Sequence, residues 1–151
     1  MKKILFPVLA LGLLSACSHR EIVSPAVEFT DPVEGYETGS DEMKYFSGLY
    51  QFSLTFPETW DGYKMVENKA TYADFEAPIL KFKSDKSIEM FAVSVFTPEE
   101  WTKVEAQEGP KPEKLGESAG HVFGWESAQD FTGAEDLAKD LPAIKASFAP
   151  L

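Results

Sequence analysis

The chain has 151 residues, 44% of them hydrophobic and 26% charged, and its 14 Lys and Arg face 25 Asp and Glu for a formal net charge of −11. This length predicts one folded domain rather than two. Because nucleic acids are bound by neutralising phosphate with Lys and Arg, the charge disfavours DNA, RNA and anionic headgroups as partners. A single cysteine excludes an internal disulfide and any zinc site built from several cysteines.

Residues 1–16 have the pattern of a lipoprotein signal peptide. A positively charged start precedes an apolar stretch, residues 4–14, which is much shorter than the roughly 20 residues that a membrane-spanning helix needs. The stretch ends in Leu14-Ser15-Ala16-Cys17, which resembles the lipobox of bacterial lipoproteins. That resemblance implies that the thiol of Cys17 carries a diacylglycerol.

Acylation of Cys17 predicts a protein that is anchored to a lipid bilayer without spanning it. Each buried methylene contributes about 0.8 kcal/mol, so two or three acyl chains make the attachment effectively permanent. The alternative is an ordinary secretory signal with an incidental cysteine, which is disfavoured because a lone thiol is a liability in an oxidising envelope. We therefore expect a location in the bacterial cell envelope. In enterobacterial lipoproteins, Asp directly after the lipidated cysteine directs the protein to the inner membrane. Ser18 occupies that position here, which favours the outer membrane if the host is Gram-negative.

Residues 17–44 are predicted to form the lipidated cysteine and a flexible acidic linker. From Ser18 to Lys44 there are seven acids against two bases, and scattered Pro and Gly interrupt any helical or strand period. The alternative is that a bound partner orders this segment, with its large apolar residues as anchors: Ile22, Val27, Phe29 and Tyr36.

The folded domain is expected to cover residues 45–151, beginning with a strand at 49–56. Aromatic and aliphatic residues alternate there with polar ones, the period of a half-buried strand, and Pro57 ends it. The apolar positions are Tyr50, Phe52, Leu54 and Phe56. Trp60 and Tyr63 follow in a predicted turn.

Three further strands are predicted, a weak one at 71–75, one at 79–83 after Pro78, and one at 88–96. The last is apolar on both faces at its centre, which is typical of an interior strand covered on both sides. Residues 114–117 and 121–126 flank Ser118-Ala119-Gly120 and predict a hairpin.

Two helices are expected to cover the sheet. Thr97, followed by Pro98 and by Glu100 three residues on, is a helix-start pattern. A second start is predicted at Thr132, and Pro142 is expected to kink or split that helix near Asp140. The order of elements predicts an α+β fold, an antiparallel β-sheet flanked by helices.

Three motifs together resemble the Mog1/PsbP-like fold, found in small bacterial lipoproteins and in an extrinsic subunit of photosystem II. They are Tyr50-x-Phe52-x-Leu54-x-Phe56-Pro57-x-x-Trp60, Leu115-Gly116-Glu117, and Ile144-x-x-Ser147-Phe148. The resemblance covers residues 45–151 and rests on packing residues. It implies an α/β sandwich whose relatives mostly bind other proteins, and it supplies no catalytic residues.

The segment Gly116-Glu117-Ser118-Ala119-Gly120 matches the G-x-S-x-G pattern of serine hydrolases. That elbow needs a buried strand before it and a helix after it, whereas a strand-like segment follows here and His121 lies in the same turn. A hairpin turn of small residues is the better interpretation. A hydrolase using Ser118 remains a distant alternative.

No metal or cofactor is expected. His121 lacks a second histidine or thiol in the domain, so a strand-edge role is favoured over metal or base chemistry. The acids of the C-terminal region could bind Ca²⁺ weakly, but first-turn charges at a helix start explain them better. They are Asp130, Glu135, Asp136 and Asp140.

The aromatic residues near turns supply the candidate binding surface. Large aromatics next to glycine are expected to be exposed, and exposed Trp and Tyr are typical of binding hot spots. The alternative is that Trp60, Trp101 and Trp125, at strand and helix spacing, belong to the core, with Trp125 and Tyr63 as the exposed exceptions. The candidates are Trp60, Tyr63, His121, Phe123 and Trp125. The sequence thus predicts a membrane-anchored, non-catalytic envelope lipoprotein that binds a protein or another envelope component, the alternative being a carrier of a small ligand or lipid.

Overall fold

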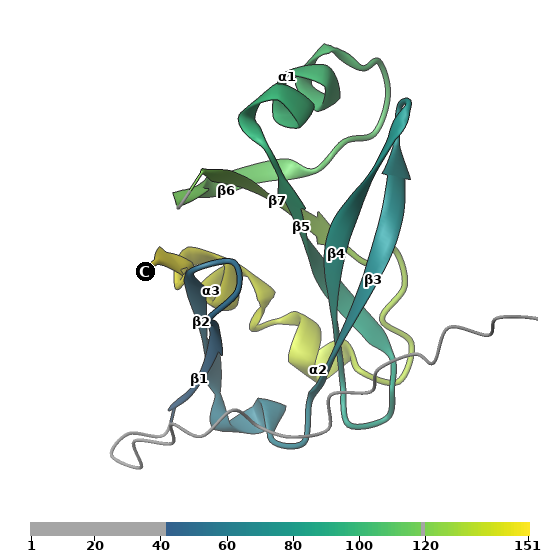
Figure 1. Ribbon diagram of the computed structural model, residues 1–151. Coiled ribbons are helices and arrows are strands. Elements are labelled where there is room, and N and C mark those ends of the chain that lie inside the picture. The colour runs from purple at the N-terminus through teal and green to yellow at the C-terminus, as the bar shows by residue number, and fades with distance from the viewer. Residues whose placement is uncertain (1–41, 119) are drawn as a thin grey trace, which may run out of the picture.

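The computed structural model describes residues 42–118 and 120–151, which form an α+β fold of two antiparallel sheets with a few short helices (Figure 1). The predicted signal peptide, Cys17 and residues 18–41 of the predicted linker lie outside this range. The elements are β1 (Glu42–Ser47), β2 (Phe52–Pro57), the 3-10 helix η1 (Glu58–Trp60), β3 (Lys64–Tyr72), β4 (Phe75–Lys83), β5 (Glu89–Phe96), α1 (Pro98–Ala106), β6 (Glu113–Ser118), β7 (His121–Ser127), α2 (Glu135–Ala138), α3 (Leu141–Ala146) and β8 (Ala149–Pro150). No helix within the described ranges is long and apolar enough to cross a membrane.

The smaller sheet has the order β1-β2-β8. The predicted alternation in β2 is confirmed, because Phe52, Leu54 and Phe56 are all fully buried. The strand begins at Phe52 rather than at residue 49, since Gln51 has a φ of 58° in the turn after β1. The folded part also starts earlier than predicted, because residues 42–44 belong to β1 instead of the linker.

The larger sheet has the order β3-β4-β5-β7-β6. The interior position predicted for residues 88–96 is confirmed, because β5 lies between β4 and β7 and is buried from Met90 to Phe96. The predicted strand at 71–75 is wrong. A turn at Ala73, whose φ is 49°, divides that region between β3 and β4.

The inner face of the larger sheet packs against β2, α2 and α3 (Figure 1). Aromatic rings dominate this core: Phe91 stacks between Phe82 and Trp125, with ring centroids 4.6 and 4.1 Å away. From α3, Leu141 and Ile144 complete it. Stacked and tilted rings at these distances contribute beyond the area that they bury.

The C-terminal helical region divides as predicted near Asp140, since α2 ends at Ala138 and α3 begins at Leu141 with Pro142 in its first turn. The predicted helix start at Thr132 is wrong. The N-cap is Ala134, with no side-chain capping bond, because the Thr132 hydroxyl donates to Asp130 Oδ1 at 2.6 Å within the preceding turn.

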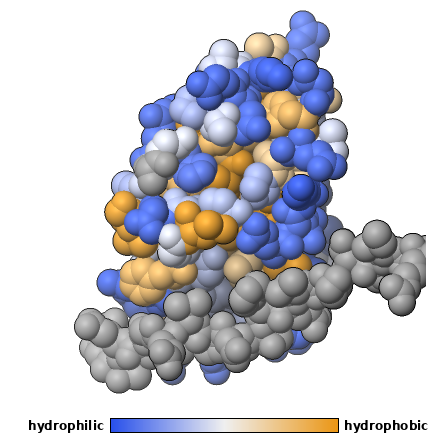
Figure 2. Space-filling model, in the orientation of Figure 1, coloured by the Kyte–Doolittle hydropathy of each residue, from blue (hydrophilic) through white to orange (hydrophobic). Residues whose placement is uncertain are grey.

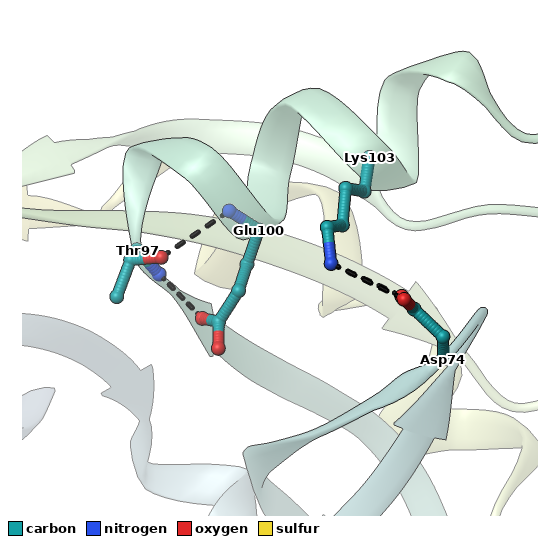
Figure 3. A network of polar contacts seen from close by, with 4 residues as sticks. All are labelled: Asp74, Thr97, Glu100 and Lys103. Atoms are coloured by element: carbon teal, nitrogen blue, oxygen red, sulfur yellow. Dashed lines mark hydrogen bonds and ion pairs between the residues drawn. The ribbon is translucent and has the colours of Figure 1, made fainter.

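Helix α1 begins as the sequence predicts. The Glu100 N–H donates to Thr97 Oγ1 at 3.2 Å and the Thr97 N–H donates to Glu100 Oε2 at 2.8 Å, a capping box (Figure 3). Lys103 Nζ lies 3.2 Å from Asp74 Oδ1, which links the helix to the β3–β4 turn. The buried side of α1, Trp101 and Val104, forms a second core with residues on the outer face of the larger sheet: Ala77, Phe96 and Val122.

Candidate functional site

Three residues of the predicted binding surface are core residues, so the expectation that they are exposed is wrong. Trp60 is 1% exposed, Phe123 0% and Trp125 5%. The reason lies in the register, which places Phe123 opposite Val95 and Trp125 opposite Val93 of the central strand, facing the core. Trp60 packs its ring against Phe56 and Phe91, with centroids 5.4 and 5.9 Å away.

The other two predicted residues are half-buried and lie far apart. Tyr63 stacks on Phe56, with centroids 4.4 Å apart, close to the end of β2. His121 packs edge-on against Tyr50, with centroids 5.8 Å apart, before β2 begins. Six residues of strand, about 20 Å, separate these places. The structure therefore does not bring the predicted aromatic residues together as one surface.

The predicted hairpin around Ser118 is confirmed, because β6 and β7 pair antiparallel and Ser118 lies directly opposite His121. The Ser118 hydroxyl donates to the carbonyl oxygen of Leu151 at 3.4 Å and forms no hydrogen bond with His121. A strand, not a helix, follows the serine. This geometry differs from a nucleophile elbow, in which the serine sits on a sharp strand-to-helix turn.

The acids considered for Ca²⁺ each have a local partner. Asp130 Oδ1 accepts from the Thr132 hydroxyl at 2.6 Å and from the Thr132 N–H at 2.9 Å, and these bonds hold the pKa of its carboxyl below the usual range. Asp136 pairs with Lys139 at 2.6 Å, which likewise lowers the pKa of the carboxyl. Within residues 42–118 and 120–151, no group of three or more His, Cys, Asp or Glu is arranged to hold a metal ion.

A surface that the sequence analysis missed lies at the start of β2. The large apolar side chains that remain most exposed among the described residues are Phe46, Leu49 and Leu151, at 41%, 72% and 56%. We call these three the apolar corner. Figure 2 shows hydrophobic surface on the side where β1, the β1–β2 turn and the end of the chain lie.

Backbone pairing places the three residues of the apolar corner near one another. Phe46 lies opposite Ser53 of β2, Leu49 lies in the turn between the strands, and the Leu151 N–H donates to the Gln51 carbonyl at 3.0 Å. One signal for Leu49 was present in the sequence. In the strand predicted at 49–56 it falls on the polar phase of the alternation, which already indicated a side chain that faces away from the core.

A polar cluster occupies the outer face of the larger sheet. Glu126 Oε1 accepts hydrogen bonds from the Tyr72 hydroxyl at 2.5 Å and from the Ser94 hydroxyl at 2.6 Å. Ser94 is completely buried, and burial, followed by the hydrogen bond with Glu126, raises the pKa of Tyr72. Sequence reasoning could not find this cluster, because its members come from β3, β5 and β7 and share no motif.

No protein-family model, curated protein or solved structure matches the chain.

Proposed function

We propose that this chain is a non-catalytic lipoprotein of the bacterial envelope, anchored to a bilayer through acylated Cys17, whose domain binds another envelope protein at the apolar corner. The observation that carries the binding role is the exposure of Phe46, Leu49 and Leu151 in one region of the surface. Exposed apolar residues that gather in one place are typical of interaction sites, whereas scattered ones are ordinary.

The free edge of β1 supports a specific mode of binding. Within the part of the chain that the structure describes, β1 pairs with β2 alone and stands at the end of its sheet. A strand from a partner that adds to this edge would gain main-chain hydrogen bonds. Phe46 belongs to the same strand, so the added strand and its side chains would cover part of the apolar corner.

The fold proposal that accompanies this function is a Mog1/PsbP-like domain. In support, five of the residues that carry the resemblance are buried in the core: Phe52, Leu54, Phe56, Trp60 and Ile144. The resemblance implies binding to proteins rather than catalysis, which agrees with the proposed role.

Cross-linking in the native envelope tests the proposal. A photo-reactive amino acid at position 49 of the full lipidated protein is expected to give a discrete adduct with one partner, because Leu49 is the most exposed residue of the apolar corner. The matched control carries the same amino acid at Thr102, on the exposed side of α1, and is expected to give no such adduct.

Two variants separate the parts of this proposal. Phe46→Ser removes apolar surface without touching the core and is expected to weaken the adduct. Cys17→Ser is expected to release the protein from the membrane fraction and to abolish an acyl mass on the mature chain. Membrane retention of Cys17→Ser would contradict the anchoring, and equal adducts from positions 49 and 102 would contradict binding at the apolar corner.

A further inference from the structure

Two segments of the chain build the apolar corner, and neither has an acidic side chain. Residues 43–57 form one of them and residues 141–151 the other, whereas residues 42–151 hold 19 acidic side chains in all. The segments meet where the Leu151 N–H donates to the Gln51 carbonyl, so that the β1–β2 turn lies beside the end of the chain (Figure 1). The apolar corner is therefore a region of an acidic domain that is built without acids.

The cation of the first segment lies on the same face of β1 as Phe46. Lys44 and Phe46 are both exposed and are two residues apart on the strand, a distance of about 7 Å. Among the described residues, Lys44 forms no ion pair. Glu42 is exposed on that face too, but it lies about 14 Å from Phe46 along the strand. The charge nearest to the apolar corner on β1 is thus an unpaired ammonium group.

Acids of other elements that contact the two segments are engaged by groups within them. Glu67 of β3 accepts from the Tyr50 hydroxyl at 2.7 Å, and Glu113 of β6 pairs with Lys145 of α3. Neither carboxylate belongs to the apolar corner, which consists of Phe46, Leu49 and Leu151.

This combination of groups favours a lipid bilayer as the occupant. Apolar side chains that project from a surface insert at the boundary of headgroups and acyl chains, and a neighbouring lysine places its ammonium group at the lipid phosphates. Acids oppose such a contact, because an anionic bilayer surface repels them. An acidic domain therefore approaches the bilayer most favourably with a region that lacks acids.

The length of chain between the lipid anchor and the domain allows this contact. Residues 18–41 separate Cys17 from Glu42 at the start of β1, and these 24 residues span at most about 80 Å. The apolar corner lies at the other end of β1, about 20 Å from Glu42. A domain held this close to a bilayer contacts it in an intramolecular event, so a small apolar surface is sufficient.

We propose that the apolar corner rests on the bilayer that holds the lipid anchor until a protein partner replaces the lipid. Phe46 and Leu49 insert among the acyl chains, and Lys44 lies at the phosphates. The inference rests on the anchoring and on the apolar corner of the proposed function, and it adds the regulation of that site. Because lipid and partner cover the same residues, the partner has to draw the domain off the bilayer.

Spin labelling of the full lipidated protein in purified vesicles tests the proposal. The thiol of Cys17 is acylated, so Gly48→Cys supplies one reactive thiol beside Leu49, at an exposed position where nothing lies within 4 Å of the added Cβ. In vesicles of phosphatidylethanolamine and phosphatidylglycerol, we expect oxygen to relax this nitroxide more than a water-soluble nickel complex does. The control label on Thr102→Cys, on the exposed side of α1, is expected to show the reverse order. The same order at both positions would overturn the proposal.

Further variants show whether the apolar corner itself causes the immersion of the label. Leu49→Ser is expected to reverse the order of the two relaxing agents at position 48, because it removes the most exposed apolar side chain. Lys44→Glu is expected to weaken immersion, whereas Lys86→Glu, the same change of charge on the exposed β4–β5 turn, leaves it unchanged. Thermal unfolding of each variant checks that the fold is retained. Immersion that survives both Leu49→Ser and Phe46→Ser would place the contact elsewhere, and the proposal is then wrong.

The outcomes separate this inference from the proposed function. If the label at position 48 stays in water while position 49 gives a protein adduct in the native envelope, the apolar corner binds protein alone and docking on the bilayer is wrong. Spin–spin broadening that disappears on dilution with unlabelled protein means that two copies meet at the apolar corner, which also overturns docking on lipid. Release of the labelled protein from the vesicles contradicts the anchoring on which both proposals rest.

Discussion

The two faces of the five-stranded sheet are built from the same strands but differ in the side chains that they carry and in the elements that pack on them. Trp125 and Glu126 are consecutive on β7, but Trp125 stacks on Phe91 in the core whereas Glu126 joins a polar cluster with Tyr72 and Ser94 on the outer face. The inner face packs against a second sheet and two helices, and the outer face against α1 alone. Stability is therefore expected to depend mainly on the inner face.

Trp125→Ala is expected to have the largest effect, a loss of about 3 to 5 kcal/mol in the free energy of unfolding. It removes the ring that stacks on Phe91 at 4.1 Å and leaves a cavity in the inner core. Chemical denaturation measures the loss. Its neighbour Glu126→Gln serves as the outer-face control and is expected to lie within about 1 kcal/mol of the unchanged protein. Similar losses for both variants would erase the distinction between the faces.

Gly124→Ala tests the covered end of the outer face and is expected to cost about 1 to 3 kcal/mol. A Cβ at this position would lie 2.6 Å from Pro112 Cβ and 3.2 Å from Phe96 Cε2, so the backbone near Pro112 has to shift. Gly48→Ala is the matched control, because nothing lies within 4 Å of its Cβ. Equal denaturation midpoints for the two variants would show that the segment at Pro112 is not tightly packed on the sheet.

Thr97→Ala is expected to cost about 1 kcal/mol, because it removes the acceptor for the Glu100 N–H at the start of α1. The loss should appear as faster amide exchange in the first turn of α1, with little change on the inner face. Thr97→Ser keeps the acceptor and should restore most of the stability. Loss of protection throughout the domain would mean that α1 and the inner core unfold as one unit.

Lys103→Ala is expected to have the smallest effect, below about 1 kcal/mol, because its pair with Asp74 is exposed on both sides. The loss should shrink further at high salt, which screens exposed charges. Thermal unfolding at low and at high ionic strength measures this loss of stability and its salt dependence. A loss that does not depend on salt would point to packing of the lysine stem on Phe75, over whose ring Nζ lies at 5.5 Å.

The elements with a strong local signal could be predicted from the sequence. The alternation from Phe52 to Phe56 and the capping residues Thr97 and Glu100 need no distant partner to form their pattern. The hairpin of β3 and β4 is harder to predict from the sequence. Its first strand stands at the sheet edge with few buried positions, and its turn has Ala73 at a positive φ, where glycine is the usual marker.

The prediction for the hairpin part of the candidate site is wrong for a different reason, the interpretation of a glycine. A glycine beside Trp125 predicts a turn that exposes the ring, whereas Gly124 lies inside β7 and permits the close approach of Pro112. A glycine can indicate exposure or tight packing, and only tertiary structure distinguishes the two. The cluster of Tyr72, Ser94 and Glu126 depends in the same way on the order of the strands, which no local pattern contains.

The central position of β5 also determines how slowly its amide hydrogens exchange with solvent. Its amide hydrogens are bonded into ladders with β4 on one side and β7 on the other, so solvent reaches them only when the sheet separates. Those hydrogens should exchange at rates set by unfolding of the whole domain. The outward amides of β1 have no neighbouring strand among the described residues and should exchange from the native state. A partner strand that adds to β1 would therefore register as slowed exchange there, with β5 unchanged as the internal reference.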